Sequence, residues 1–127
     1  MEQYLIDTNV VSDYLSASFS AEAMVQMDTI IDAIPNLSVI SQIELLCWQT
    51  DAAIEEKVTN FIADSVVLDI SQAVITQCVN VRKGKKIKTP DAIIAATALA
   101  HGFTLITNNE KDFTRVKGLK ILNPYKL

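Results

Sequence analysis

Residues 4–15 read YLIDTNVVSDYL, and this stretch decides the fold. It opens with an apolar run from Tyr4 to Ile6 that is typical of a buried strand, and apolar residues return with helical spacing from Val10 onward. The polar interruption between them begins at Asp7. An acid at this junction follows the carboxyl end of a strand, where open α/β sheets bind their ligands. Asp7 is therefore a candidate ligand-binding residue.

The same alternation of short and long segments continues along the chain. Short aliphatic runs separated by longer segments of helical period favour parallel strands joined by crossover helices. The expected strands span residues 3–6, 37–40, 66–70, 104–107 and 119–122. The expected helices span residues 10–15, 21–34, 42–49, 52–63, 72–81 and 91–100, the last capped by Thr89 and ended near Gly102. The sequence thus predicts an α/β fold.

Composition limits what kind of protein this is. The chain has 127 residues, of which 50% are hydrophobic, and this length suits a single domain over residues 1–127. Its apolar runs are too short to span a membrane and Glu2 stands where a signal peptide has basic residues, so we expect a cytoplasmic protein. Cys47 and Cys78 lack metal-type spacing and are expected to be buried free thiols.

Charge is distributed unevenly along the chain. The net charge is −4, but residues 1–81 carry twelve acidic and one basic side chain, whereas residues 82–127 carry three acidic and ten basic ones. Half of these ten bases lie in the stretch RKGKKIK, which comprises Arg82, Lys83, Lys85, Lys86 and Lys88. Such a cluster can bind phosphates, and a solvated loop explains it equally well on charge alone.

Further acids lie at the ends of other expected strands and helices. Glu44 comes after the second strand, Asp91 opens the helix before the fourth strand, and the polar stretch from Asn108 to Asp112 follows that strand. Each has a local explanation: Ser41 to Glu44 fits a capping box, Asp91 complements a helix dipole, and Asp7 can cap a helix. Together, however, three acids at one sheet edge repel one another unless a cation neutralises them.

The types of residue present restrict the chemistry. Oxygen ligands with no cluster of histidine or cysteine suit Mg²⁺ or Mn²⁺ and disfavour zinc. The only histidine, His101, lies at an expected helix end, where it interacts with the helix dipole. The three glycines are scattered, so a phosphate-binding P-loop has no support. Trp48 falls in the apolar run ELLCW and is expected in the core.

The ordered set of motifs resembles a known family. The segments YLIDTNVVSDYL, LSVISQIELL, TPDAIIAATALAHGFTLITNNEKDF and GLKILNPY, from Tyr4 to Pro124, look like a PIN domain, and most like the VapC-like toxins of toxin and antitoxin pairs. The resemblance implies a three-layer α/β/α sandwich with a mainly parallel sheet of about five strands. It also implies metal-dependent cleavage of RNA by an endoribonuclease.

The resemblance also implies roles for particular residues. Asp7, Glu44 and Asp91 match the first three family acids, so they become the catalytic residues and the expected ligands of Mg²⁺ or Mn²⁺. The fourth position is often aspartate in the family and is Asn109 here. Asp112 is a possible substitute for it. Asn9 and Thr107 match polar residues that line such sites and are expected to orient ligands or substrate.

Partners follow from the resemblance as well. It implies an RNA substrate, a cognate antitoxin protein whose tail occupies the active-site groove, and a homodimer. The apolar residues that could supply a dimer surface, or equally a core-facing stripe, are Val25, Ile30, Ile31 and Ile34.

Two alternatives to a nuclease stay open at this point. A phospho-acceptor receiver domain also places acids and Mg²⁺ at this sheet edge, with Asp69 as its acceptor, but Thr8 stands where a receiver has a second acid. The other alternative is a PIN module that has lost catalysis and only binds RNA or protein. The departure at Asn109 keeps this second alternative open.

Overall fold

A single parallel sheet forms the centre of the computed structural model, which describes residues 2–126. Within these residues the strands are β1 (Tyr4–Ile6), β2 (Asn36–Ser38), β3 (Val66–Leu68), β4 (Thr104–Ile106) and β5 (Ile121–Leu122). They lie in the order β3-β2-β1-β4-β5, and every pairing is parallel. Leu5 of the central strand β1 is in register with Leu105 of β4 and with Asn36 of β2. The expected parallel sheet is confirmed.

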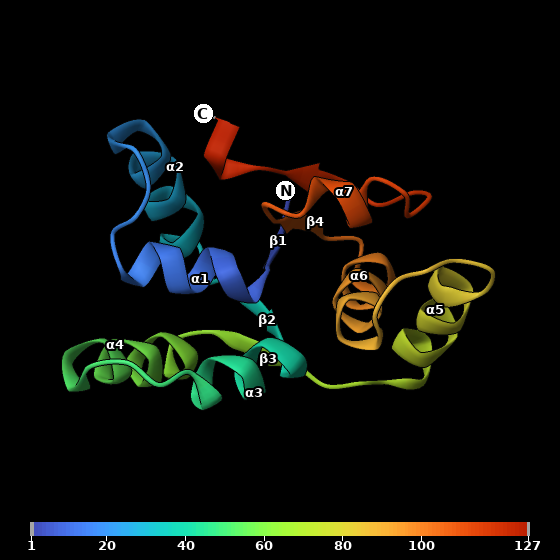
Figure 1. Ribbon diagram of the computed structural model, residues 1–127, viewed down its shortest axis with the longest axis horizontal. Coiled ribbons are helices and arrows are strands. Elements are labelled where there is room, and N and C mark those ends of the chain that lie inside the picture. Colours follow the sequence, from blue (N-terminus) through green and yellow to red (C-terminus); the bar gives the residue numbers. More distant parts are fainter. Residues whose placement is uncertain (1, 127) are drawn as a thin grey trace.

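Helices cover both faces of this sheet (Figure 1). The helices are α1 (Thr8–Leu15), α2 (Ala21–Asp32), α3 (Val39–Cys47), α4 (Ala52–Ala63), α5 (Gln72–Arg82), α6 (Thr89–His101) and α7 (Glu110–Phe113), followed by the 3-10 helix η1 (Pro124–Lys126). In Figure 1, α1, α2 and α4 lie to the left of β1, whereas α5 and α6 lie to the right. The chain therefore has the expected α/β/α architecture.

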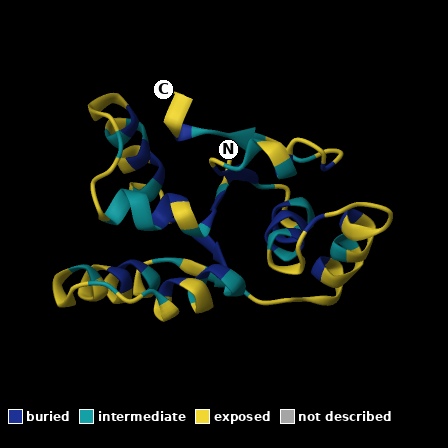
Figure 2. Cartoon of the chain, viewed as in Figure 1, coloured by how far each residue is buried: buried dark blue, intermediate teal, exposed yellow. Residues whose placement is uncertain are grey.

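The strands alternate their side chains between two cores. Leu5 and Leu105 pack with buried residues of α5, α6 and α7, whereas the next residues, Ile6 and Ile106, pack with buried residues of α1 to α4. This follows from the two-residue period of a strand. All four side chains have no exposed surface, so the sheet is covered on both sides (Figure 2).

Three helix starts differ from the sequence prediction. Helix α1 begins at Thr8, two residues before the expected start, because Asp7 caps it. Helix α3 begins at Val39, three residues before the expected start, because Ser38 caps it by accepting a hydrogen bond from the Ile40 amide at 3.1 Å. Helix α6 begins at Thr89 itself, which removes Thr89 as a cap, and its N-cap residue Lys88 makes no side-chain capping bond. Its expected end is confirmed by Gly102, whose φ of 71° favours glycine.

The two cysteines are free thiols, as expected, but they are not buried as expected. Cys47 is exposed and Cys78 is half-buried. Cys47 lies in the last turn of α3, on a different face of the helix from Leu45, which packs in the core. The uniformly apolar run around Cys47 concealed which face of the helix is buried.

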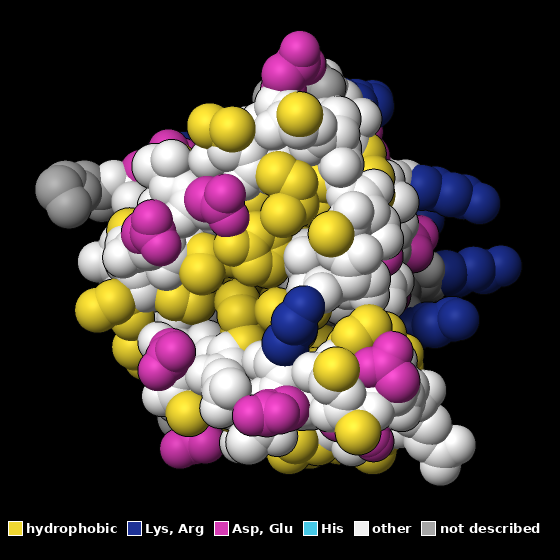
Figure 3. All heavy atoms as spheres, turned by 90° about the vertical axis from the view of Figure 1, so that its left-hand side faces the viewer, with side chains coloured by type: hydrophobic (Ala, Val, Ile, Leu, Met, Phe, Trp, Pro, Cys, Tyr) yellow, Lys and Arg dark blue, Asp and Glu magenta, His cyan; other side chains and the backbone are white. Residues whose placement is uncertain are grey.

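The surface beside α1, α2 and α4 is partly apolar. Figure 3 shows hydrophobic side chains gathered in a hollow on this face, with lysine and arginine side chains projecting from one side of the view. Of the residues considered for a dimer surface, Val25 and Ile34 are exposed, Ile31 is half-buried and Ile30 is in the core. None of the helices within residues 2–126 combines the length and apolar character needed to cross a membrane.

Candidate active site

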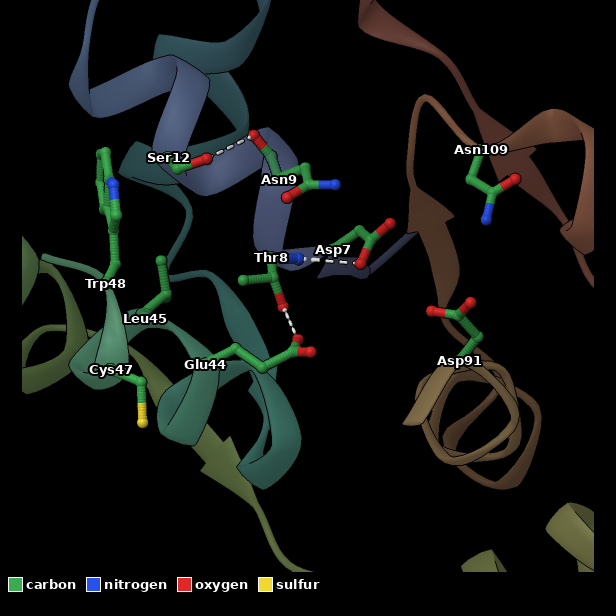
Figure 4. Close-up of a pocket in the computed structure, with 10 residues that line it drawn as sticks. All are labelled: Asp7, Thr8, Asn9, Ser12, Glu44, Leu45, Cys47, Trp48, Asp91 and Asn109. Atoms are coloured by element: carbon green, nitrogen blue, oxygen red, sulfur yellow. Dashed lines mark hydrogen bonds between the residues drawn. The ribbon is translucent and has the colours of Figure 1, made fainter. Parts of the chain in front are cut away.

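A cavity of about 580 Å³ opens at the carboxyl edge of the sheet (Figure 4). Ten residues line it: Asp7, Thr8, Asn9, Ser12, Glu44, Leu45, Cys47, Trp48, Asp91 and Asn109. They come from the ends of β1 and β4, from α1 and α3, and from the start of α6. The structure thus brings together Asp7, Glu44, Asp91 and Asn109, which are far apart in the sequence.

Asp7 is the most buried of these acids. It caps α1, its Oδ1 accepts a hydrogen bond from the Thr8 amide at 2.8 Å, and its Oδ2 accepts one from Thr107 Oγ1 at 2.8 Å. Burial raises the pKa of Asp7 above its usual value. The bonds from Thr107 and Thr8 lower that pKa, and the nearby charges of Asp91 and Glu44 raise it. Asp7 is therefore held in one orientation in a site that disfavours its negative charge.

Glu44 lies in the middle of α3, where its side chain is exposed. Its Oε1 accepts a hydrogen bond from Thr8 Oγ1 at 2.6 Å, and Thr8 Oγ1 is also 2.9 Å from Ser41 Oγ. The expected capping box is therefore wrong: Ser38 is the cap, and Ser41 is a buried residue within the helix. The roles of Thr8 and Ser41 are not visible in the sequence, because Thr8 lies 33 residues from Ser41 and 36 residues from Glu44.

Asp91 lies in the first turn of α6 and is half-buried. Burial raises the pKa of Asp91, and the charges of Asp112 and Glu44 raise it further, whereas Lys88 lowers it. A helix N-terminus attracts negative charge, yet the neighbouring acids and the burial outweigh this attraction. The carboxylates around the cavity are therefore close enough to interact electrostatically.

A second set of hydrogen bonds reaches the site from the residues that follow β4. The Asn109 amide donates to Thr107 Oγ1 at 3.0 Å, and the Thr107 hydroxyl in turn donates to Asp7. Asn109 also caps α7: its Oδ1 accepts from the Asp112 amide at 3.3 Å and its Nδ2 donates to Asp112 Oδ2 at 3.1 Å. Asp112 itself is not one of the cavity-lining residues. Asn109 therefore connects the Asp7 side of the site to Asp112.

The other end of the cavity is less polar. Trp48, expected in the core, is only half-buried and stands across the cavity from Asp91 (Figure 4). Leu45 and Cys47 lie near it, whereas Asn9 is exposed and lines the cavity between Trp48 and Asp7. The cavity thus has an acidic end and a partly apolar end.

The donor atoms suit a hard divalent cation. They are carboxylate, amide and hydroxyl oxygens, which Mg²⁺ and Mn²⁺ prefer. Within residues 2–126, no group of three or more His, Cys, Asp or Glu side chains is spaced to hold a metal ion as it stands. Mg²⁺ is commonly held through one or two carboxylates and several waters, so an open arrangement of acids fits such an ion.

The remaining residues singled out in the sequence lie outside the cavity. The basic cluster forms the end of α5 and the loop before α6, where all five of its side chains are exposed. Within it Arg82 Nε donates to the Ile87 carbonyl at 3.1 Å, and Lys88 is the member whose charge acts on Asp91. Asp69, the residue that a receiver domain would phosphorylate, is exposed after β3 and does not line the cavity.

Comparison with protein families adds a further finding. The PIN domain family model matches residues 4–119 of this chain. A curated relative, Ribonuclease VapC1 from Rickettsia felis, is 56% identical over 36 residues. That alignment covers 28% of this chain and 27% of the relative.

Solved structures resemble the whole chain. A toxin-antitoxin complex from Klebsiella pneumoniae contains a chain with 30% identity and a TM-score of 0.76, and the match covers 98% of this chain and all of that one. DNA-bound VapBC from Salmonella typhimurium matches with 22% identity and a TM-score of 0.80, over 98% and 99% of the two chains. FitAcB from Neisseria gonorrhoeae matches with 23% identity and a TM-score of 0.78, over 98% and 100%. The last two likenesses show the fold.

Proposed function

This chain belongs to the PIN domain family, and on that premise we propose that it is a metal-dependent endoribonuclease, the toxin of a toxin and antitoxin pair. One observation carries the proposal. The buried carboxylate Asp7, fixed by two hydrogen bonds, shares a cavity with Glu44 and Asp91. Holding three acids together is costly unless a cation neutralises them.

The roles of the acids follow from their positions. Asp7 and Asp91 would hold Mg²⁺ or Mn²⁺, directly or through water, and Glu44 would be a further ligand or would orient the attacking water. A divalent ion bound there lowers the pKa of water and stabilises charge on the phosphoryl oxygens. The hydrogen bonds to Asp7 favour its ionised form, which is the form that attracts a cation. Thr107 and Asn109 keep that carboxylate oriented.

The path of the RNA follows from charge and cavity shape. The basic cluster Arg82, Lys83, Lys85, Lys86 and Lys88 precedes α6, the helix that presents Asp91, so its exposed side chains can hold the phosphate backbone beside the acids. A cavity of about 580 Å³ has room for more than a phosphate and an ion. Trp48 at the partly apolar end offers a surface on which a base can stack.

The partners of this protein are part of the same proposal. The similar chain from Klebsiella pneumoniae belongs to a toxin-antitoxin complex, which supports an antitoxin partner here. The first 81 residues are strongly acidic, so a cationic antitoxin segment complements them. We extend the proposal to a homodimer that acts in the cytoplasm, and the exposed side chains of Val25 and Ile34 are available for such a contact.

Cleavage of RNA by purified protein tests the function. A panel of structured RNAs is incubated with Mg²⁺ or Mn²⁺, with EDTA, and with Asp7→Ala; the exposed Asp69→Ala serves as the matched control. We expect cleavage that requires the metal and Asp7 and that survives in Asp69→Ala. Cleavage that persists in Asp7→Ala and in EDTA refutes the proposal.

An inactive protein would need a second measurement, titration with Mn²⁺. Binding of Mn²⁺ to the wild type, lost in Asp7→Ala, supports a nuclease whose target RNA is absent from the panel. Failure to bind Mn²⁺ favours the alternative of a PIN module that only binds RNA or protein. The observation that supports this alternative is that Asn109 stands at the fourth acidic position.

A further inference from the structure

One residue contacts two of the three acids. The Thr8 amide donates to Asp7 Oδ1 at 2.8 Å, and the Thr8 side-chain oxygen is 2.6 Å from Glu44 Oε1. Asp7 follows β1 and Glu44 lies on α3, so Thr8, the first residue of α1, directly links two segments that supply the cavity. Figure 4 shows Thr8 between the two carboxylates.

Proton counting fixes the direction of these bonds. A threonine hydroxyl has one proton, and an ionised carboxylate only accepts. The Thr8 proton therefore goes to Glu44, and the buried Ser41 hydroxyl, 2.9 Å away, donates to Thr8 Oγ1. The result is a chain of two hydroxyls that ends on one oxygen of Glu44.

The two hydroxyls form a chain that ends on Glu44, which is the least constrained of the three acids. Asp7 is buried and accepts two hydrogen bonds. Glu44 is exposed, and its longer side chain can adopt more rotamers when no hydrogen bond holds it. Among residues 2–126, the hydrogen bonds of Glu44 engage Oε1 and leave Oε2 without a protein donor. Thr8 thus holds one oxygen and leaves the other facing the cavity.

We propose that Thr8 is a positioning residue, which with Ser41 fixes the Glu44 carboxylate at a set distance from Asp7 for divalent-cation binding. The proposal rests on the proposed function, because it assumes that these acids bind a cation. Losing an outer partner of a metal-binding carboxylate typically weakens metal affinity by about 10–100-fold. A purely structural bridge between α1 and α3 would instead alter stability and leave metal affinity unchanged.

The test is Mn²⁺ binding to the full chain, measured by electron paramagnetic resonance of free Mn²⁺ in the absence of RNA. Thr8→Val removes the hydroxyl but keeps the amide that bonds to Asp7, and Thr8→Ser restores the hydroxyl. The control is Thr29→Val, which replaces an exposed threonine on α2 whose hydroxyl donates to the Val25 carbonyl. Melting curves without metal show whether each variant is folded.

We expect Thr8→Val to bind Mn²⁺ about 10-fold more weakly or worse, and Thr8→Ser and Thr29→Val to bind as the wild type does. Because Thr8→Val leaves the Ser41 hydroxyl without its partner, the double variant Thr8→Val with Ser41→Ala is measured as well, and it should show the same weakening. Equal affinity of wild type and the folded Thr8→Val variants overturns this inference alone. A wild type that binds no Mn²⁺ overturns the metal-dependent function first, and this inference with it.

Discussion

Thr107 and Asp7, which lie 100 residues apart in the sequence, are joined by a hydrogen bond of 2.8 Å from Thr107 Oγ1 to Asp7 Oδ2. The bond crosses between the ends of the adjacent strands β1 and β4. It is buried, and it favours the ionised form of Asp7, whose pKa is raised by burial.

Replacing Thr107 with valine should therefore change the pH dependence of RNA cleavage more than the stability of the fold. Loss of the bond raises the pKa of Asp7, so the acidic limb of the pH–activity profile moves to higher pH. We expect RNA cleavage at neutral pH to fall by about 10–100-fold. The measurement is the cleavage rate against pH for wild type, Thr107→Val and Thr107→Ser. A profile that keeps its acidic limb in Thr107→Val contradicts the role given to this bond.

Removing a charged acid from the metal-free site should stabilise the fold. The pKa of Asp91 is raised in the folded state, so the folded chain holds more protons than the unfolded chain between the unfolded pKa of about 3.9 and the higher folded pKa. Protonated Asp91 makes its full contribution to stability below the unfolded pKa. That contribution is lost as the pH rises through the folded pKa. Asp91→Asn should therefore melt above the wild type at pH 7.

Thermal melting in EDTA at pH 7 and at pH 3.5 measures this effect. A gain of about 1 kcal/mol raises the Tm of a chain of this size by about 3–5 °C. We expect the gain from Asp91→Asn at pH 7 to shrink at pH 3.5, and the exposed Asp69→Asn to give no comparable gain. A lower Tm for Asp91→Asn at pH 7 would show that Asp91 stabilises the helix more than its neighbours repel it.

Asn109→Asp tests the fourth acidic position. The new carboxylate keeps an oxygen that can cap α7, but it loses the amide that donates to Asp112 Oδ2. Two acids then face each other, so we expect lower stability without metal and Mn²⁺ binding at least as tight as in the wild type. Melting with and without Mn²⁺ checks both effects. A variant that Mn²⁺ stabilises less than it stabilises the wild type would show that Asn109 is preferred as an amide.

Lysines of the basic cluster should control the salt dependence of RNA binding. Each lost contact with a single strand reduces the slope of log affinity against log salt concentration by about 0.7. We expect Lys85→Ala with Lys86→Ala to weaken binding and to reduce the slope by about 1.4. The experiment titrates a catalytically silent Asp7→Ala background with RNA at several salt concentrations.

A matched control for this experiment is Lys117→Ala with Lys120→Ala. These exposed lysines precede β5, so they lie toward the edge of the parallel sheet opposite the cavity. The control should leave the slope close to that of the parent. Equal effects of the two pairs would mean that RNA responds to overall charge and not to the cluster.

The sequence predicted the fold well because its signals are local. The apolar run before Asp7 and the same pattern at β4 identify the strands that β-α units require, and the glycine after α6 identifies its end. Strands were expected one or two residues too long, because a β-branched residue such as Val39 suits both a strand and the first turn of a helix. The placement of Asp7 at a ligand-binding edge needed only the strand and its direction.

Contacts within the site were much harder to predict. The interaction of Thr8 with Glu44 depends on how α1 packs against α3, and no local pattern encodes that packing. From the sequence, Ser38 and Ser41 are equally plausible caps of α3. The prediction of a capping box assumed Ser41, and it therefore gave Glu44 a capping role that the structure does not show. Trp48 was expected in the core, because an apolar run at a helix end does not show which side chain remains at the surface.

The central position of β1 has a consequence for the timing of folding. β1 precedes β4 by about a hundred residues, yet the two strands are direct neighbours, with Leu5 in register with Leu105. Such long-range pairing forms late, after the loop between the strands has been closed. While the chain is still being synthesised, β1 lacks one neighbour and Asp7 lacks Thr107. The carboxylate of Asp7 thus gains its Thr107 partner only after nearly the whole chain has been synthesised.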